Sequence, residues 1–224
     1  MKRRAFIAAT GAGIMALPFI PHLSPPPALQ AGPVSPEERR RRAFPNVVLR
    51  THEDKEVRFY DDLVKDKTVL LHFMYIGCQD GYCGLSVANL ARVEKELKGR
   101  VGRDVFFYSI TLDPEHDTPA ALKKYARHFA RNPGWLCLTG KPEAIETLRR
   151  ALGFVQPDPI LDQDKSYHVG YARIGIEPLE RWAAAPVLGR PRTIASYLRW
   201  MEPNGERPTP WMLVGKNGRS RTTA

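Results

Sequence analysis

The sequence predicts an α/β domain with a mixed central sheet that is flanked by helices. Apolar runs of strand length alternate with segments that have the apolar period of a helix. The chain of 224 residues is long enough for one domain with a sizeable core. Hydrophobic residues make up 43% and charged residues 26%, which is the balance of a globular protein and excludes a disordered or membrane-spanning one.

The first 31 residues are expected to form an export signal. A basic start, Met1–Arg4, precedes an uncharged apolar stretch at 5–20 that is short for a membrane span and contains Gly and Pro. Small residues follow, and cleavage is expected after Ala31. Arg3 and Arg4 also resemble the pair of a twin-arginine signal. The alternative is that this segment remains as an uncleaved anchor in the inner membrane.

Export to the periplasm would change the meaning of the cysteines and of the charge. Disulfides persist outside the cytoplasm, so a close cysteine pair is oxidised there more readily. The formal net charge is +10, and part of it is the run Arg39–Arg42 in a Pro-, Glu- and Arg-rich stretch at 32–42, which we interpret as a flexible linker. Positive charge suits nucleic acid or anionic lipid, but no nucleic-acid-binding motif accompanies it.

The folded domain is predicted over residues 43–201, before a tail at 202–224 that is rich in Pro, Gly and Asn and is expected to be poorly ordered. The domain opens with a hairpin because two strand-like runs flank a short turn. Nearly continuous apolar runs are typical of buried central strands. The predicted elements are, in order, a hairpin (46–50 and 56–60), a strand (68–76), a helix (84–98), a strand (104–112), a helix (119 to about 130), a strand (135–139), a helix (142–153), a hairpin (167–175 and 179–185) and a helix (193–201).

The helices carry their own start and stop signals. In the first helix, Leu90, Val93 and Leu97 are spaced three and four residues apart, which places them on one face. Thr118 is expected to cap the second helix, with proline at its first position. Proline also opens the third helix, and Gly153 ends it.

Two cysteines, Cys78 and Cys83, lie where the first long strand gives way to a helix. Loops at the carboxyl ends of strands often carry function in α/β sheets, and a helix N-terminus stabilises a thiolate. Positions five apart on a continuous helix diverge by about 140°, so the sulfurs meet only if the helix begins no earlier than Tyr82. Gly81 gives the loop the freedom that it needs. The pair suits a metal clamp, a redox dithiol or a disulfide; Asp80 between them either holds the loop through backbone N–H groups or is an exposed carboxylate.

A metal site would need a third ligand, and the chain offers six histidines. His72 lies in a central strand and is expected to be a packed neutral side chain, whereas His128 is expected on a helix surface. His168 follows a loop at 158–167 and begins a strand at a sheet edge, from where its side chain could reach the cysteine loop. The six are His22, His52, His72, His116, His128 and His168.

Three other residues have simpler interpretations. Cys137 lies mid-strand between leucines and is expected to behave as a small buried hydrophobe. Asp113 and Asp117 resemble an acidic pair, but Asp113 is expected to end a strand and Asp117 to help cap a helix.

The segment 108–119, YSITLDPEHDTP, is similar to the Asp-Pro-x-x-Asp-Thr-Pro signature of the SCO/SenC family. The segment Trp135–Gly140 and the helix at 142–153 resemble the next family block, and the resemblance covers about residues 44–200. It implies a thioredoxin-like fold. It also implies an exported copper protein that helps to assemble the binuclear copper site of cytochrome c oxidase.

The resemblance implies that Cys78, Cys83 and His168 bind one copper ion as Cu(I) or Cu(II). The family motif is Cys-Pro-x-x-Cys-Pro, whereas this chain has four residues between its cysteines, Gln79 after the first and Gly84 after the second. Soft thiolates and an imidazole suit Cu(I). The same two cysteines could instead form a disulfide, which would exclude the metal.

We therefore expect a metallochaperone, which is not an enzyme, with a copper-accepting respiratory enzyme subunit as its partner. The alternative is a periplasmic thiol–disulfide oxidoreductase that uses Cys78 and Cys83 and exchanges electrons with a thiol reductant, although a Cys-x-x-Cys motif is missing. A thiol peroxidase, with Cys78 attacking and Cys83 resolving, has no supporting polar residues in the sequence. No nucleic-acid partner is expected. Contact with a membrane is expected only if the N-terminal segment remains uncleaved.

Overall fold

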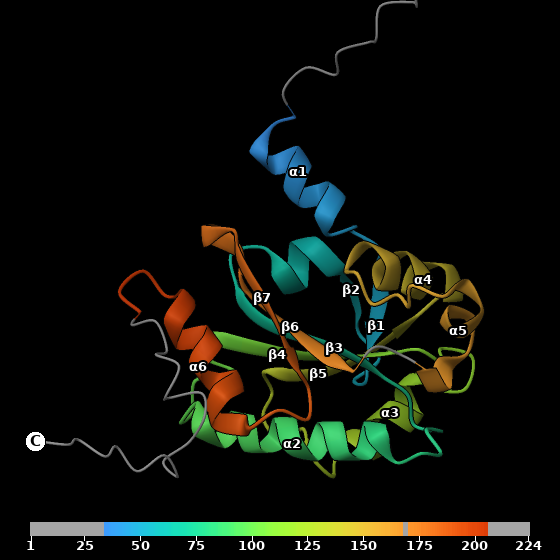
Figure 1. The fold of residues 1–224 in the computed structure, drawn as a ribbon. Helices are drawn as coiled ribbons and strands as arrows, with labels where there is room; N and C mark the ends of the chain where they lie inside the picture. Colours follow the sequence, from blue (N-terminus) through green and yellow to red (C-terminus); the bar gives the residue numbers. More distant parts are fainter. Residues whose placement is uncertain (1–33, 168–169, 206–224) are drawn as a thin grey trace, which may run out of the picture. The chain divides into compact units, whose positions relative to one another are not determined.

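The computed structural model describes residues 34–167 and 170–205 (Figure 1). The chain divides into two compact units, Met1–Val34 and Ser35–Ala224, and the fold described below belongs to the second. The expected export signal and nearly all of the expected tail lie outside the described residues. Within the described ranges, no helix is both long and apolar enough to cross a membrane.

The described chain folds into helices on both faces of a central sheet (Figure 1). Short 3₁₀ turns, η2 and η3, and a π-helical turn, η1, join some of the elements. The elements are α1 (Pro36–Ala43), β1 (Val48–Thr51), β2 (Glu56–Arg58), η1 (Phe59–Val64), β3 (Thr68–Met74), α2 (Tyr82–Glu96), β4 (Val105–Thr111), α3 (Pro119–Ala126), β5 (Trp135–Gly140), α4 (Pro142–Ala151), α5 (Pro159–Gln163), η2 (Lys165–Tyr167), β6 (Tyr171–Ile176), η3 (Glu177–Leu179), β7 (Arg181–Pro186) and α6 (Pro191–Met201).

In the described part of the chain the sheet has seven strands in the order β2-β1-β5-β4-β3-β6-β7. Its centre is parallel, because β4 pairs in parallel with both β3 and β5. The two hairpins, β1–β2 and β6–β7, extend it in antiparallel fashion at either side. The predicted mixed α/β sheet with an N-terminal hairpin is therefore confirmed.

Each face of the sheet packs its own hydrophobic core. One face is covered by α2, α3 and α6, whose apolar residues meet Leu70 and Phe107 of the central strands. The other face is covered by η1 and α4, which pack on Leu71 and Tyr108. Successive residues of β3 and β4 thus point to opposite cores, which explains why these strands are continuously apolar.

The predicted elements occur in the predicted order, but the helices α1 and α5 and the turn η1 were not predicted. Other differences lie at element ends, and the strand expected from 167 begins at Tyr171. The strand expected at 56–60 ends at Arg58, because the next two aromatic side chains enter the buried turn η1. The helix capped by Thr118 ends at Ala126, before 130. The helix expected at 84–98 runs from Tyr82 to Glu96, so it includes Cys83 and begins at the earliest residue that the spacing argument allowed.

The flexible linker expected at 32–42 is wrong for most of its length, since helix α1 covers Pro36–Ala43. The Ser35 side chain accepts the Glu38 N–H at 3.1 Å, and a proline stands at the first helical position. Ion pairs four residues apart join Glu37 to Arg41 and Glu38 to Arg42. The arginine run is thus part of a capped helix in which acids precede bases, an arrangement that favours the helix dipole.

Two leucines of α2 provide a matched test of this packing. Leu90 is fully buried in the core, whereas Leu85 is 61% exposed. We expect Leu90→Ala to lower the free energy of unfolding by about 2–5 kcal/mol and Leu85→Ala to change it by less than about 0.5 kcal/mol. Urea denaturation of the full chain measures both values, and equal losses would contradict the placement of α2.

Candidate functional site

The cysteines lie at the edge of the sheet where β3 and β4 end. These strands run parallel and in register, so that Met74 of β3 is level with Thr111 of β4. The segments that follow them, 75–81 and 112–118, therefore leave the sheet side by side. This is the edge at which α/β sheets place ligands.

The turn between the cysteines brings both of them to the start of α2. Gly81 has a φ of +74° in the left-handed region and occupies the N-cap position of α2. The backbone N–H of Cys83 donates a hydrogen bond to the Sγ of Cys78 at 3.3 Å. The four-residue gap thus folds as a loop that lets the two residues converge, and Cys78, Cys83 and Cys137 are thiols that form no disulfide in this structure.

Asp80 fixes this loop from inside. Its Oδ1 accepts the Tyr82 N–H at 2.9 Å and the Cys78 thiol at 2.8 Å. One carboxylate oxygen therefore holds the first N–H of α2 and the first cysteine together. Of the two sequence interpretations of Asp80, the loop-holding one is confirmed, although the side chain is also exposed.

The two thiols differ in exposure. Cys83 is only 1% exposed, and the Tyr75 N–H donates to its Sγ at 3.5 Å. Burial raises the pKa of the Cys83 thiol, and the neighbouring Cys78 and Asp80 raise it further, against the effect of the Tyr75 N–H. Cys78 is half-buried and faces the loop. The site therefore offers one accessible sulfur and one at the edge of the core.

Asp117 ties the second loop to the first. Its carboxylate is 2% exposed and accepts the Ile76 N–H at 3.1 Å and the Thr111 hydroxyl at 2.5 Å. Burial raises the pKa of this carboxyl, which these two donors oppose. The expectation that Asp117 helps to cap α3 is wrong, since Thr118 accepts the Ala121 N–H and provides that cap.

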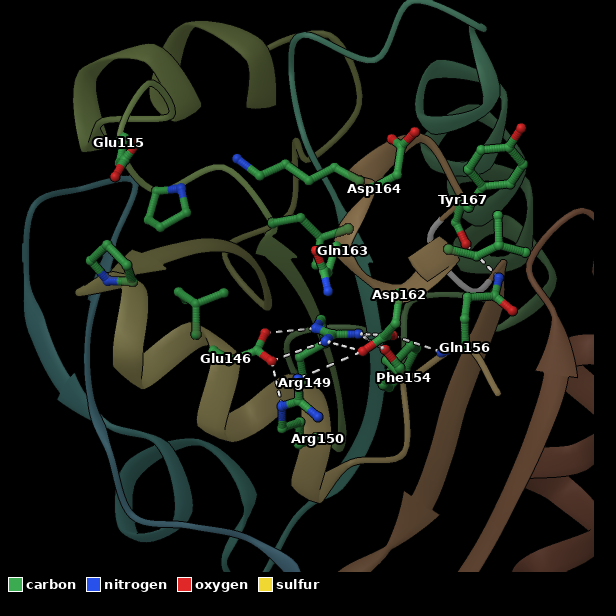
Figure 2. Close-up of a pocket in the computed structure, with 16 residues that line it drawn as sticks. Glu115, Glu146, Arg149, Arg150, Phe154, Gln156, Asp162, Gln163, Asp164 and Tyr167 are labelled. Atoms are coloured by element: carbon green, nitrogen blue, oxygen red, sulfur yellow. Dashed lines mark hydrogen bonds and ion pairs between the residues drawn. The ribbon is translucent and has the colours of Figure 1, made fainter. Parts of the chain in front are cut away.

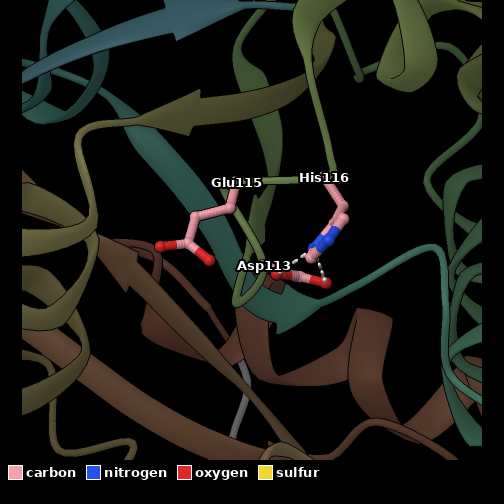
Figure 3. A group of neighbouring side chains, drawn as sticks. All are labelled: Asp113, Glu115 and His116. Atoms are coloured by element: carbon pink, nitrogen blue, oxygen red, sulfur yellow. Dashed lines mark hydrogen bonds and ion pairs between the residues drawn. The ribbon is translucent and has the colours of Figure 1, made fainter.

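Asp113, Glu115 and His116 gather in the same second loop (Figure 3). His116 lies 3.1 Å from the Asp113 carboxylate, which also accepts Lys165 Nζ at 2.8 Å. Burial raises the pKa of Asp113, but the hydrogen bonds from Lys165 and His116 outweigh it and lower the value overall. A lysine ammonium thus already occupies this carboxylate, and we assign no metal to the group.

A pocket of about 390 Å³ beside this loop is organised by Arg149 of α4 (Figure 2). The guanidinium donates to Glu146 at 2.8 Å and to both carboxylate oxygens of Asp162 at 2.6 and 2.7 Å. The Gln156 side chain donates to the main-chain carbonyl of Tyr167. These contacts anchor the segment 156–167, the loop that precedes His168 in the sequence.

His168 itself lies outside the described residues, but the chain on its C-terminal side is described. The Tyr82 hydroxyl donates to the Gly170 carbonyl at 3.0 Å. A Cβ added at Gly170 would overlap this hydroxyl, so the close approach requires glycine. Sequence reasoning missed this contact, because no local signal links Tyr82 to Gly170, which lies two residues after His168.

The other described histidines are engaged elsewhere. His72 is buried, with Nε2 at 2.6 Å from the Ser109 hydroxyl, which confirms its packed role. His52 accepts the Cys137 N–H at 3.1 Å, and burial lowers the pKa of its ring. His128 is exposed just after α3. Cys137 is fully buried, as expected, and burial raises its pKa to about 12.

The difference in exposure predicts the order in which the thiols react. With iodoacetamide added to the native reduced chain, we expect Cys78 to be alkylated at least about tenfold faster than Cys83 or Cys137, because these two are buried and hold their protons more tightly. Peptide mass spectrometry after short exposures measures the rates. All three should react alike in denaturant, and equal native rates for Cys78 and Cys83 would contradict the geometry.

Comparisons with known proteins agree with this architecture. The chain is 29% identical over 135 residues to a putative copper-binding protein of Stutzerimonas stutzeri, covering 59% of this chain and 62% of that protein. It is 33% identical over 105 residues to the mitochondrial SCO2 homolog of Bos taurus, covering 46% of this chain and 38% of that protein. The chain thus matches less than two thirds of the length of these relatives.

Among solved structures, Bradyrhizobium japonicum ScoI with copper bound is similar with a TM-score of 0.54 and 25% identity, covering 69% of this chain and 96% of that one. A family model described as SCO1/SenC matches residues 48–173. That range contains both cysteines, the Asp117 loop and the segment around residue 168. The chain therefore belongs to the SCO1/SenC family and has its thioredoxin-like fold.

Proposed function

We propose that this chain binds one copper ion through Cys78, Cys83 and His168 and delivers it to the copper site of cytochrome c oxidase or a related respiratory enzyme. The observation that carries the proposal is that the loop with Cys78, the start of α2 with Cys83 and the segment at Gly170 lie in contact. The Cys83 N–H meets Cys78 Sγ, and Tyr82 holds the carbonyl of Gly170, two residues beyond His168 in sequence.

The donor set fits copper, the cargo, in its reduced state. Two sulfurs and an imidazole suit Cu(I), which prefers soft ligands and few of them. Each thiol would lose its proton on binding, so uptake releases protons to solvent. The positive ion would offset the cost of holding a thiolate at the buried Cys83 position.

An exposed first sulfur and a buried second one suit transfer as well as binding. Cys78 is accessible from solvent, so an incoming protein thiol or imidazole can reach the ion on that side. Cys83 is held in place in α2 by its burial and would bind the ion from the side of the hydrophobic core. Ligand exchange could then proceed one donor at a time, without release of free copper.

The relatives support this assignment. The Stutzerimonas protein is described as copper-binding, and the Bradyrhizobium structure contains copper. We extend copper binding from them to this chain because the family match includes the positions of both cysteines. We also propose that the chain acts in the periplasm after export, where its copper acceptor would be exposed.

A second function is favoured by the same geometry. Two free thiols that approach through a short glycine-containing loop could form a disulfide and act as a thiol–disulfide oxidoreductase. The hydrogen bond from the Cys78 thiol to Asp80 does not separate the two functions, because it is lost both in a disulfide and when the thiol gives up its proton to bind copper. The missing Cys-x-x-Cys motif argues against the oxidoreductase as the main role.

Copper titration of single variants tests the ligand set. We expect the reduced full chain to bind one Cu(I), and Cys78→Ser or Cys83→Ser to lower the affinity by more than about 100-fold. Residues that only orient a metal ligand contribute about 10- to 100-fold to metal affinity. We expect His168→Ala to lower the Cu(I) affinity by a factor of this size. Competition with a chromophoric Cu(I) chelator measures each affinity.

Cys137→Ser is the matched control, because this thiol is buried within strand β5 and is not part of the 78–83 loop. Its copper affinity should equal that of the unchanged chain. Unchanged affinity in a Cys78 or Cys83 variant would refute the site. Weak copper binding combined with rapid turnover of a model disulfide would favour the oxidoreductase instead.

Tyr82→Phe tests whether the Gly170 contact helps to place the third ligand. Loss of the hydroxyl removes the hydrogen bond to the Gly170 carbonyl, so we expect copper affinity to fall by up to about tenfold. The same change in a His168→Ala background should have no further effect, since the ligand it places is gone. Additive losses in the double variant would show that Tyr82 acts on the cysteines alone; Tyr197→Phe on α6 is the control.

A further inference from the structure

A shallow groove of about 410 Å³ lies between α2 and the end of α3, on the face of the sheet that these helices cover. On α2 it is lined by a stripe that recurs every three or four residues and includes Gly84, Ala88 and Ala91. On the other side it is lined by Tyr125 and Phe129. Its floor is therefore apolar, and the α2 side is made of small residues.

The groove begins at the cysteine turn. Gly84 follows Cys83 directly, and a Cβ built on it would meet nothing within 4 Å, so this end is open. Tyr125 lines the groove and also lies near the cysteine turn. Burial raises its pKa to about 12, and the nearby Cys83, Cys137 and Cys78 add to the shift. The exposed Leu85, one turn before Ala88, continues the apolar surface toward the cysteines.

The rim of the groove is positively charged. Arg92, Lys95 and His128 line it and are exposed. Among the described residues, neither Arg92 nor Lys95 forms an ion pair, unlike most arginines of α1 and α4. The segment 118–131 adds four lysines and arginines and contains no acid, although Lys123 is paired with Glu53. The apolar floor and the basic rim together fit a ligand that has apolar side chains and a negative charge.

We propose that this α2–α3 groove docks an acidic amphipathic segment of the protein that exchanges copper with the chain. Apolar side chains of that segment would cover the alanine stripe while its carboxylates meet Arg92 and Lys95. Docking there would bring the partner's metal ligands to the accessible side of the half-buried Cys78. The identity of the partner as a copper-exchanging protein rests on the proposed function, but the docking chemistry does not.

A protein segment fits this groove better than a nucleic acid. Single strands bind by stacking bases on exposed aromatic rings. Phe129 is only 7% exposed, and its ring packs against Tyr125 and Trp135. The Phe129 ring is therefore largely covered and offers little surface for stacking, whereas the small α2 side chains leave room for aliphatic ones.

The test uses the reduced, copper-free full chain and a fluorescein-labelled helical peptide. The peptide carries leucines three and four residues apart and glutamates at its other positions. Binding is followed by fluorescence anisotropy. Comparison ligands are the same peptide with lysines for glutamates, the same peptide with serines for leucines, and a single-stranded oligonucleotide of similar length.

Two groove variants and one matched control are compared. Arg92→Glu/Lys95→Glu reverses the rim, and Ala88→Trp fills the floor from an exposed position that does not enter the core. Lys65→Glu/Lys141→Glu makes the same change in net charge beside η1 and α4, the elements of the opposite face. We expect the acidic peptide to bind the chain and the control alike, and each groove variant at least about tenfold more weakly.

Several results would overturn the proposal: no binding of the acidic peptide, equal binding of the lysine or serine peptide, equal affinity of the groove variants, or an oligonucleotide that binds more tightly with the same variant dependence. Because copper is absent throughout, failure here is distinct from failure of the copper site. A chain that binds the peptide but not copper would keep the groove and lose the metallochaperone role.

Discussion

The buried carboxylate of Asp117 is the constraint on which the site depends. It accepts one hydrogen bond from the backbone of the cysteine segment and one from the end of β4. The parallel register of β3 and β4 brings these groups within reach, and the carboxylate then fixes where the chain leaves β3. A buried acid that is satisfied by two donors holds its partners firmly, because an unpaired one would be costly. The direction of the Cys78 turn follows from this tie.

The turn itself is held by a second carboxylate. Asp80 joins the start of α2 to the Cys78 thiol, in a gap that is one residue longer than the family motif and lacks its prolines. In this chain the loop is restricted by the hydrogen-bonded side chain of Asp80 and by Gly81 in the left-handed conformation, whereas the family motif has prolines in this role. The two cysteines therefore stay together across the longer gap.

Sequence reasoning reached the α/β fold, the element order and the start of α2, because apolar periods, proline starts and the Cys-to-Cys spacing are local signals. It missed α1, although Ser35, Pro36 and the acid-before-base order were visible, because an arginine-rich run beside prolines was given more weight. It also misassigned Asp117. Neither the link from Asp117 to Ile76 nor that from Tyr82 to Gly170 could be found locally, because each joins residues that are far apart in sequence.

The proposed copper site has two sulfur donors and one imidazole nitrogen, and a single measurement can test this donor set. X-ray absorption spectroscopy of the full chain loaded with one Cu(I) reports the donor atoms directly. We predict a three-coordinate ion with two sulfur scatterers and one nitrogen whose outer-shell pattern is that of imidazole. A spectrum with sulfur donors alone, or with nitrogen and oxygen donors alone, would contradict the Cys78, Cys83 and His168 site.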